Sequence, residues 1–502
     1  MGAGTSMLIV AENPLSFDLW TGLFGSWWQF GVALDIMLRV AGVCLVILRK
    51  GSRPQVAGSW VAVIAVLPFV GIFAYLLIGE SRLGSRHRRV HKEVLARFER
   101  PEFHLHDDPA TRAISMDPSD TQVARIAVSA AGSPPLAGNT ADLFGDSAEA
   151  IAKLLEDIAT ARETVHLMTY IWLDDRVGEA VGDALVAATR RGVVCRVLVD
   201  SQGSRSFLGG RAVRTLRAHG VHIVGALPVH PLRMLFSRID IRNHRKLAVI
   251  DGCTGWIGSM NIAAPEFAIQ KRFAPWVDCM MRLEGPAVRE IQLIFAEDWY
   301  LDTNESIEEL LRICPPVHAG GLTAHIVASG PNYFNEAIRS LLVGSIQVAD
   351  NEIVLTTPYF VPDQSISSAL CVAAQRGVIV RLVVPRRNNS WLVALASRAG
   401  YSELLRSGVH IHEFKLGLLH AKTVTVDGKF GIVTSSNLDR RSFDLNFEAT
   451  GLVYDDRFTR ELRQIQQAYI DGSDEVSAVA WAKRPLRRRL AQNAAALISP
   501  LL

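Results

Sequence analysis

A histidine and a lysine two residues apart stand before an apolar run at two places in this 502-residue chain. Each pair is followed by an Asp-Gly turn and then by a Ser-x-Asn triplet, and the two histidines are 176 residues apart. A chance double match of so long a pattern is improbable, so it indicates an internal duplication. The two copies contain His244, Lys246, Asp251, Ser259 and Asn261, and His420, Lys422, Asp427, Ser435 and Asn437.

Side chains alternate between the two faces of a β-strand, and this separates the roles within each copy. His244 and Lys246 share one face, whereas Asp251 falls on the other face. Asp251 therefore cannot orient its own histidine along the strand, and we expect a structural role for it at the Asp-Gly turn. The same parity holds in the second copy.

If the two copies meet, they form a cationic pocket that is rich in hydrogen-bond donors. Two histidines beside two lysines repel a divalent cation, so we expect neither a metal nor another cofactor. Such a pocket suits an anionic tetrahedral phosphate, because lysine supplies charge and the polar side chains supply donors. We expect the substrate phosphate to contact Ser259, Asn261, Ser435 and Asn437.

The two histidines suit nucleophilic and general acid–base roles, because imidazole titrates near neutrality. One histidine would attack phosphorus to form a covalent phospho-histidine, while the other protonates the leaving oxygen. An alcohol activated by the same base would then release the product, with Lys246 and Lys422 stabilising the transition-state charge. The spacing leaves open which histidine attacks, and the fuller first motif favours His244.

Each imidazole needs an acceptor that orients its second nitrogen. Glu266 and Glu448 are the candidates, since they follow Asn261 and Asn437 by 5 and 11 residues. The alternative for either glutamate is an exposed loop residue. Their parallel placement favours the orienting role.

The elements that position these residues also recur. Continuous apolar strands alternate with helices that end at glycine, which predicts an α/β sheet covered on both faces. The duplication predicts two similar domains, or one pseudo-symmetric domain, with the paired motifs meeting on the axis. The first set comprises strands at 163–172 and 193–200 around a helix at 177–192, and the second comprises strands at 351–362 and 378–387 around a helix at 365–377.

Two apolar stretches near the N-terminus predict membrane helices. Residues 58–78 hold no charge over a length that can cross a bilayer, and Pro68 should kink this helix. Residues 27–48 include Asp35 and Arg39, which lie four residues apart and can pair on one helical face. This second stretch either spans the bilayer or lies at its surface, and neither stretch resembles a cleaved signal peptide.

Basic residues gather beside the apolar stretches and at the C-terminus. Residues 81–100 hold seven Lys and Arg against two Glu, and residues 481–502 hold five and no acidic residue. The net charge is +3, so these segments, with +10 together, leave about −7 for the remainder. Such clusters suit an anionic membrane surface rather than nucleic acid, for which the body itself would be basic.

The chain has six cysteines, and none of them forms a C-x-x-C pair. Several lie inside apolar runs, as Cys195 does. We expect buried free thiols in a reducing compartment, and neither disulfides nor a zinc site.

The duplicated motif resembles that of the phospholipase D superfamily, H-x-K-x4-D-x6-G-S-x-N. The finer resemblance is to bacterial cardiolipin synthases, and it runs from about residue 40 to the C-terminus. It implies two N-terminal membrane helices, two phospholipase-D-like α/β domains, no required metal, and a catalytic set that includes Asp251 and Asp427. The resembling segments are LPFVGIFAYLLIGESRL (67–83), YIWLDD (170–175), WVDCMMRLEGPAV (276–288), FAEDW (295–299), TTPYFVPD (356–363) and LDRRSFDLNFE (438–448).

One position departs from the family pattern. Thr434 stands in the second copy where the family usually has glycine, as the first copy does at Gly258. Threonine is tolerable there if the position lies on a strand, but it would distort the site if the backbone needs a positive φ. Because the other motif residues are all present, we expect an intact second half.

The resemblance implies a membrane-bound phosphatidyltransferase that joins two phosphatidylglycerol molecules into cardiolipin and releases glycerol. A phospholipase D that uses water as acceptor is the alternative, and a nuclease is a weaker one. We expect the bacterial inner membrane as location, with the catalytic body on the cytoplasmic side. The acceptor lipid and the oligomeric state stay open, with a homodimer among the alternatives. The mixed apolar and basic segment 227–242 could dip toward the membrane or pack as an ordinary loop.

These observations predict five consecutive parts. They are a membrane segment at 1–80, a basic segment and linker at 81–135, a first phospholipase-D-like domain at 136–318, a second at 319–480, and a basic amphipathic tail at 481–502.

Overall fold

The computed structural model describes residues 15–48, 54–79, 116–228, 240–266, 268–306, 315–331 and 336–498, with residues 89, 93, 238, 313 and 333 as isolated positions. The chain divides into two compact units, an N-terminal unit up to residue 80 and a body that follows it. Most of the expected basic segment at 81–100, and most of the segment at 227–242, lie outside the described residues.

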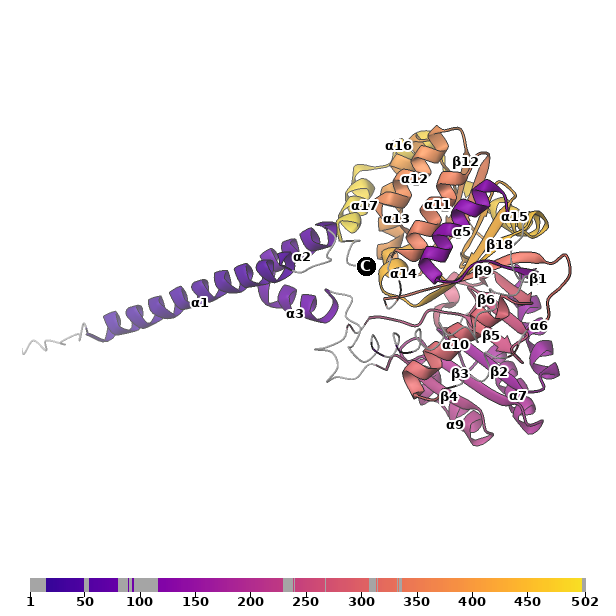
Figure 1. Cartoon of the computed structure of the whole chain (residues 1–502). Helices are drawn as coiled ribbons and strands as arrows, with labels where there is room; N and C mark the ends of the chain where they lie inside the picture. The colour runs from indigo at the N-terminus through magenta and orange to yellow at the C-terminus, as the bar shows by residue number, and fades with distance from the viewer. Residues whose placement is uncertain are drawn as a thin grey trace, which may run out of the picture. The chain divides into compact units, whose positions relative to one another are not determined.

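The N-terminal unit holds three helices, α1 (Leu15–Ile47), α2 (Pro54–Val66) and α3 (Pro68–Ile78) (Figure 1). The single kinked helix expected over 58–78 is therefore wrong, because the chain breaks at Leu67, whose φ of −130° and ψ of 76° are not helical. A proline lacks the N–H that would continue the helix, and it disfavours helical geometry in the residue before it. The result is two helices of 13 and 11 residues instead of one.

Helices α2 and α3 fold back on one another. A Cβ added at Gly71 would lie only 2.9 Å from the Cα of Ile64, so glycine permits the close approach of the two backbones. Trp60 and Tyr75 meet edge to face, with their ring centroids 5.4 Å apart. Within the described residues, only α1 is long and apolar enough to cross a membrane, over Trp28–Ile47.

The predicted pairing of Asp35 with Arg39 is confirmed at 2.6 Å. The Arg39 guanidinium also donates to the carbonyl of Ala65 in the last turn of α2. A helix end leaves carbonyls without partners, and the break at Leu67 creates such an end. Arg39 of α1 therefore hydrogen-bonds to the C-terminal turn of α2.

The body is built on one 15-stranded mixed sheet. In the first half the strands are β1 (Leu136–Phe144), β2 (Thr164–Thr169), β3 (Val194–Asp200), β4 (His222–Ala226), β5 (Leu247–Ile250), β6 (Thr254–Gly258) and β8 (Met280–Glu284). In the second half they are β9 (Leu322–Ser329), β10 (Glu352–Thr356), β12 (Ile379–Pro385), β13 (His410–Phe414), β15 (Thr423–Val426), β16 (Phe430–Thr434), β18 (Glu448–Tyr454) and β19 (Ser473–Glu475).

The order of the strands shows that the two halves are built alike. Outward from the boundary between β1 and β9, one side runs β1-β8-β6-β5-β2-β3-β4 and the other runs β9-β18-β16-β15-β10-β12-β13. Strand β5, which follows the first His-x-Lys pair, thus corresponds to β15, which follows the second. The duplication in the sequence is a pseudo-two-fold repeat in the fold, as predicted.

Helices cover both faces of the sheet, which confirms the α/β prediction. Alternate residues of β2 and β3 pack to opposite sides of the sheet: Leu167 and Val197 join one core with α6 and α7, and Met168 and Leu198 join another with α10. The helices of the two halves are α6 (Ser147–Thr160), α7 (Arg176–Arg190), α8 (Arg205–Gly209), α9 (Arg211–Ala218) and α10 (Val288–Thr303), then α11 (Ala337–Val348), α12 (Gln364–Gln375), α13 (Trp391–Arg406), α14 (Arg440–Asp444) and α15 (Asp456–Asp471).

Part of the expected linker is a folded helix. Helix α5 (Pro118–Ala131) precedes the first half in the sequence, yet it packs beside α11 of the second half (Figure 1). Its residues Val123 and Ala127 are fully buried in that core. Residues 118–131 therefore do not form a linker, because their apolar positions recur at helical spacing and bury against α11.

The cysteines in the described part of the chain are free thiols. Cys195, Cys279 and Cys371 are buried, Cys253 is partly buried, and Cys44 is exposed. The structure thus agrees with the expectation for three of them, and Cys314 lies outside the described residues.

Candidate active site

The two histidines lie in extended segments that lead into β5 and β15. Both strands form hairpins with the next strand, β5 with β6 and β15 with β16. His244 is only 8% exposed and His420 only 3% exposed. Their backbones are fixed by the opposite half, since His244 N donates to the carbonyl of Phe447 and His420 N donates to that of Val277.

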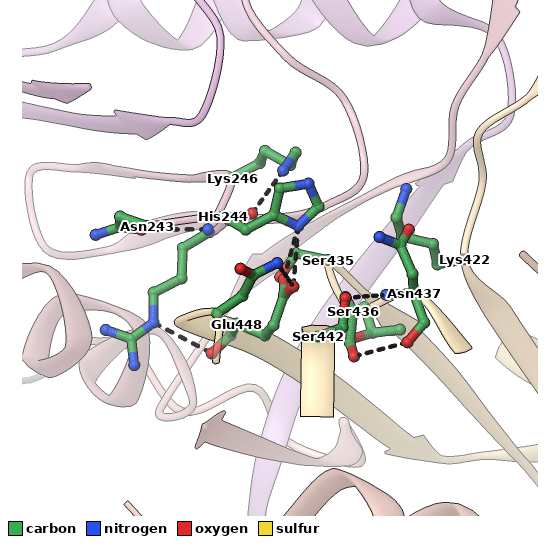
Figure 2. Close-up of polar contacts among 12 residues, drawn as sticks. Asn243, His244, Lys246, Lys422, Ser435, Ser436, Asn437, Ser442 and Glu448 are labelled. Atoms are coloured by element: carbon green, nitrogen blue, oxygen red, sulfur yellow. Dashed lines mark hydrogen bonds and ion pairs between the residues drawn. The ribbon is translucent and has the colours of Figure 1, made fainter. Parts of the chain in front are cut away.

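Each histidine is held by a carboxylate from the other half. His244 Nδ1 lies 3.0 Å from both carboxylate oxygens of Glu448, which opens strand β18 (Figure 2). His420 Nδ1 lies 2.6 Å from Oδ1 of Asp278, which stands just before β8. Strands β8 and β18 occupy equal places in the two halves, so Asp278 and Glu448 are pseudo-symmetric partners.

Glu266 does not orient a histidine, and that prediction is wrong. Its side chain is 65% exposed and pairs with Arg176 at 3.1 Å. The residue that lies beside His420 is Asp278, which the motif spacing did not single out. A signal was present in the sequence, because Asp278 follows an aromatic-aliphatic pair, Trp276-Val277, much as Glu448 directly follows Phe447.

The motif serines hold the carboxylates and do not reach toward a substrate. Ser435 Oγ donates to Glu448 Oε2 at 2.5 Å, and Ser259 Oγ donates to Asp278 Oδ1 at 2.7 Å. Both serines are fully buried. The expected phosphate contact of Ser259 and Ser435 is therefore corrected to a supporting hydrogen bond behind each histidine.

The two lysines lie close to the histidines that precede them. Lys246 Nζ donates to the carbonyl oxygen of His244 at 2.5 Å, as Figure 2 shows, and Lys422 Nζ donates to that of His420 at 2.7 Å. Lys246 Nζ also lies 5.3 Å from the centre of the Tyr170 ring. Each ammonium has two further N–H donors, but both lysines are only 1% exposed and neither lines the pocket that the two histidines share.

The motif aspartates lie at the far ends of the hairpins. Asp251 has a φ of 51° at the turn, and its carboxylate accepts three backbone N–H bonds, from residues 162, 163 and 164. Asp427 does the same for residues 350, 351 and 352. The structural role predicted from strand parity matches this geometry. Membership of Asp251 and Asp427 in the catalytic set does not, because both carboxylates are engaged by backbone N–H groups at the hairpin ends opposite the histidines.

The two arginines that flank the first motif have different surroundings. Arg245 is fully buried and pairs with Asp298 at 2.7 Å, on the face opposite His244. Arg242 lines the pocket that holds the two histidines. Only Arg242 is therefore placed to contact a substrate.

A pocket of about 310 Å³ contains His244 and His420 together. Both motif asparagines, Asn261 and Asn437, line it, and Asn261 Oδ1 accepts the backbone N–H of Ile171 at 3.1 Å. That bond leaves the Asn261 amide nitrogen as a donor. The wall also includes the aromatic residues Tyr170, Trp276 and Tyr359 and the arginines Arg242, Arg440 and Arg441.

Burial sets the protonation of the histidines. It lowers the pKa of His244 to about 4 and that of His420 to about 3, although their carboxylate partners act in the opposite direction. Burial alone would raise the pKa of Asp278, but His420, Lys422 and Ser259 lower it to about 2. A carboxylate can only accept, so each Nδ1 carries the proton and each Nε2 keeps its lone pair at neutral pH.

The lysines are also perturbed. Burial lowers the pKa of Lys246 to about 7 and that of Lys422 to about 8, while Glu448 and Asp278 oppose this change. Within the described residues no group of His, Cys, Asp and Glu could hold a metal ion. The arrangement could bind a phosphate group beside two imidazole nitrogens that keep their lone pairs.

Thr434 is accommodated as a strand residue. It is the last residue of β16, and its Oγ1 lies 2.6 Å from Oγ1 of Thr450 on the neighbouring strand. The counterpart position, Gly258, cannot hold a side chain in the same way, because a Cβ there would overlap the carbonyl oxygen of Cys279. Threonine was expected to be tolerated at position 434 if that position lies on a strand, and it does.

Comparison with known proteins agrees with this architecture. The family described as cardiolipin synthase, PLD-like domain, matches residues 154–299 and again residues 342–469. The family described as phospholipase D-nuclease N-terminal matches residues 40–80. The first match falls once on each half of the sheet.

Individual relatives extend over nearly the whole chain. The cardiolipin synthases A of Yersinia pseudotuberculosis serotype IB (strain PB1/+) and of Yersinia pestis are each 37% identical over 487 residues, which is 96% of this chain and 98% of theirs. The crystal structure of a phosphatidylserine synthase from Haemophilus influenzae Rd KW20 matches with a TM-score of 0.59 and 14% identity, over 77% of this chain and all of that one. This last likeness shows a shared fold.

Proposed function

The chain belongs to the cardiolipin synthases with paired phospholipase-D-like domains, and we propose that it transfers a phosphatidyl group from one phosphatidylglycerol molecule to another. The products are cardiolipin and glycerol. The observation that carries this proposal is the pair of buried histidines in one pocket, each held at Nδ1 by a carboxylate of the opposite half.

In the first step, Nε2 of His244 attacks the phosphorus of one phosphatidylglycerol and displaces the glycerol oxygen. His420 delivers a proton to that oxygen, so that neutral glycerol leaves and a phosphatidyl-histidine remains. The anionic phosphate opposes the effect of burial on the pKa of His420, and so favours the protonated ring that this step needs.

In the second step, a terminal hydroxyl of the other phosphatidylglycerol gives its proton to His420. The resulting alkoxide attacks phosphorus, and the bond to His244 breaks. Asn261 and Asn437 donate hydrogen bonds to the phosphoryl oxygens in both steps, and the positive charges of the buried Lys246 and Lys422 stabilise the negative charge on those oxygens. Glu448 and Asp278 hold the imidazoles in the required tautomer and stabilise positive charge on them.

Product analysis tests the proposal. The purified full-length protein, reconstituted in bilayers with phosphatidylglycerol that carries a labelled glycerol headgroup, should release labelled glycerol and form cardiolipin. If phosphatidic acid is the sole lipid product, the protein is a phospholipase D and the transferase assignment is wrong. Adding phosphatidylethanolamine in a second reaction identifies the acceptor lipid.

The identity of the nucleophile needs a separate experiment. After rapid acid quenching, peptide mapping of a phospholipid adduct should locate it on His244. An adduct on His420 in the wild-type protein would reverse the assignment and leave the two-step mechanism intact.

The chain acts on phospholipid and associates with membrane, as its family implies. We place the catalytic body on the cytoplasmic side of a bacterial inner membrane, because basic residues gather directly after the apolar stretches. A maleimide that cannot cross membranes should fail to label a cysteine introduced at exposed Arg211 in intact spheroplasts and should label it after lysis. Labelling before lysis would put the body on the outer side.

A further inference from the structure

The C-terminal segment forms a surface that adjoins the catalytic pocket. Helices α16 (Ala478–Ala482) and α17 (Leu486–Ile498) close the body, and α17 lies along α13 (Figure 1). Its inner side is buried, because Ala495 is 3% exposed and packs with Ala396 of α13 and Val361. The helix is thus a docked part of the fold with one face left outward.

That outward face is apolar. Leu486, Leu490 and Leu497 are 67%, 61% and 76% exposed. At 3.6 residues per turn their spacing of four and seven places them in one narrow stripe, opposite buried Gln492 and Ala495. Three large exposed apolar side chains in line on a docked helix indicate a contact surface, because such residues otherwise lose free energy in water.

Arginines border the leucine stripe on both sides. On the helical wheel Arg487 falls on one flank of the stripe and Arg489 on the other, and both are exposed. A helix with leucines between cationic flanks matches the geometry of one that lies in the plane of a membrane surface, with leucines in the acyl region and arginines at the phosphates.

An open groove of about 920 Å³ adjoins this helix between α13, α16 and α17. Seven basic side chains line the groove against one acidic side chain, Glu413, which Arg398 already neutralises. Among the residues that the structure describes, no acidic side chain lies within ion-pair distance of Arg387, Lys483 or Arg488. The groove therefore carries a surplus of positive charge beside the apolar stripe.

The surface is continuous with the wall of the catalytic pocket. Val361, against which α17 packs, lines that pocket, and so do Ser390 and Val393 at the start of α13. Trp391 lies between them in the sequence and is 73% exposed. Tryptophan is favoured at membrane interfaces, so this tip of α13 suits the headgroup level.

We propose that α17 and the adjoining basic groove dock the catalytic body on an anionic bilayer, with Leu486, Leu490 and Leu497 inserted between acyl chains and the groove occupied by anionic headgroups. The docked surface brings the wall of the catalytic pocket to the level from which lipid substrates enter. Charge complementarity selects the occupant, since an apolar stripe alone would serve a second protein copy equally well.

Insertion is tested by fluorescence on the full-length protein. An environment-sensitive dye is attached to Leu490→Cys in a background of Cys44→Ser, Cys253→Ser and Cys314→Ser, and the protein is placed in nanodiscs. With phosphatidylglycerol present the emission should shift to the blue and be quenched by spin-labelled acyl chains. A dye at Val372→Cys, an exposed apolar position on α12, is the matched control and should do neither.

This measurement does not need turnover, so it stands even if the proposed function fails. Identical spectra for the Leu490 dye in phosphatidylcholine and in phosphatidylglycerol nanodiscs would overturn the docking proposal. A blue shift that appears in detergent without bilayer and grows with protein concentration would do the same, because it assigns the stripe to a second copy.

The charge is tested by turnover, and this arm rests on the proposed function. Arg487→Gln with Arg489→Gln should weaken docking up to about 30-fold, because each cation near anionic headgroups contributes about 1 kcal/mol. The apparent KM for phosphatidylglycerol in bilayers should rise, while turnover of a monomeric short-chain phosphatidylglycerol stays unchanged. The control pair Arg211→Gln with Arg214→Gln on α9 removes equal charge and should change neither the docking nor the apparent KM. Equal effects of the two pairs would refute the assignment of the docking surface to α17.

Discussion

Glu448 of the second half holds His244 of the first half, with both carboxylate oxygens 3.0 Å from Nδ1 across 204 residues of sequence. The reciprocal bond joins Asp278 to His420 at 2.6 Å. Neither half therefore contains a complete histidine–carboxylate pair. We therefore expect catalysis to require both halves, because each half supplies the acceptor that fixes the histidine tautomer in the other.

Replacing Glu448 by glutamine should lower kcat roughly 10²–10⁴-fold, the range that properly held acid–base groups contribute. An amide can donate to Nδ1 and thereby stabilise the wrong tautomer. The measurement is the steady-state formation of cardiolipin, with thermal unfolding as a check on folding. Glu266→Gln is the matched control, because Glu266 is exposed and pairs with Arg176 instead of a histidine, and it should retain activity. A comparable loss in both variants would contradict the assignment.

Asp278→Asn should cause a similar loss, and the double variant with Glu448→Gln should be little worse than either single variant. Residues that act as one unit give strongly non-additive losses. If the two losses multiply, Asp278 and Glu448 serve independent steps and the cooperative pair is refuted. The readout is kcat/KM for the two single variants and the double variant under one set of conditions.

Activity should fall on the alkaline side as the buried lysines lose their charge. Their pKa values are lowered by burial to about 7 for Lys246 and about 8 for Lys422, so positive charge is present below these values and disappears above them. The log of kcat/KM against pH should bend downward between about 7 and 8. Lys246→Arg keeps its charge throughout this range, so any activity it retains should bend at higher pH. If Lys246→Arg retains measurable activity and its activity falls at the same alkaline pH as in the wild type, deprotonation of Lys246 does not cause the fall.

The two pseudo-equivalent positions Gly258 and Thr434 should respond in opposite ways. Thr434→Gly removes a strand side chain and its 2.6 Å contact with Thr450 Oγ1, so stability should fall by about 1 kcal/mol with activity retained. Gly258→Thr should reduce folded protein and activity sharply, because its Cβ would overlap the Cys279 carbonyl beside Asp278. Urea unfolding and cardiolipin formation together distinguish the two outcomes. If both substitutions leave stability and activity equally intact, β6 and β8 can separate to accept a side chain at position 258, and the prediction is wrong.

The sequence by itself determined the duplication, the α/β class and the two histidine–lysine pairs. His244, Lys246, His420 and Lys422 could be identified because a long pattern recurs with constant spacing and strand parity sorts its members onto faces. The turn position of Asp251 followed from the same local rule. The strand faces and the turn depend on residues that are close together in the sequence, so the spacing of residue types is enough to predict them.

The tertiary structure alone decided which carboxylates serve the histidines. Glu266 and Asp278 are both acidic and both follow the first motif, yet only Asp278 stands before β8, whose place in the sheet carries it to His420 of the other half. The docking of α5 on α11 is also a contact between segments that are far apart in the sequence. Such contacts arise from burial and sheet order over the whole chain, so no local spacing could have specified them.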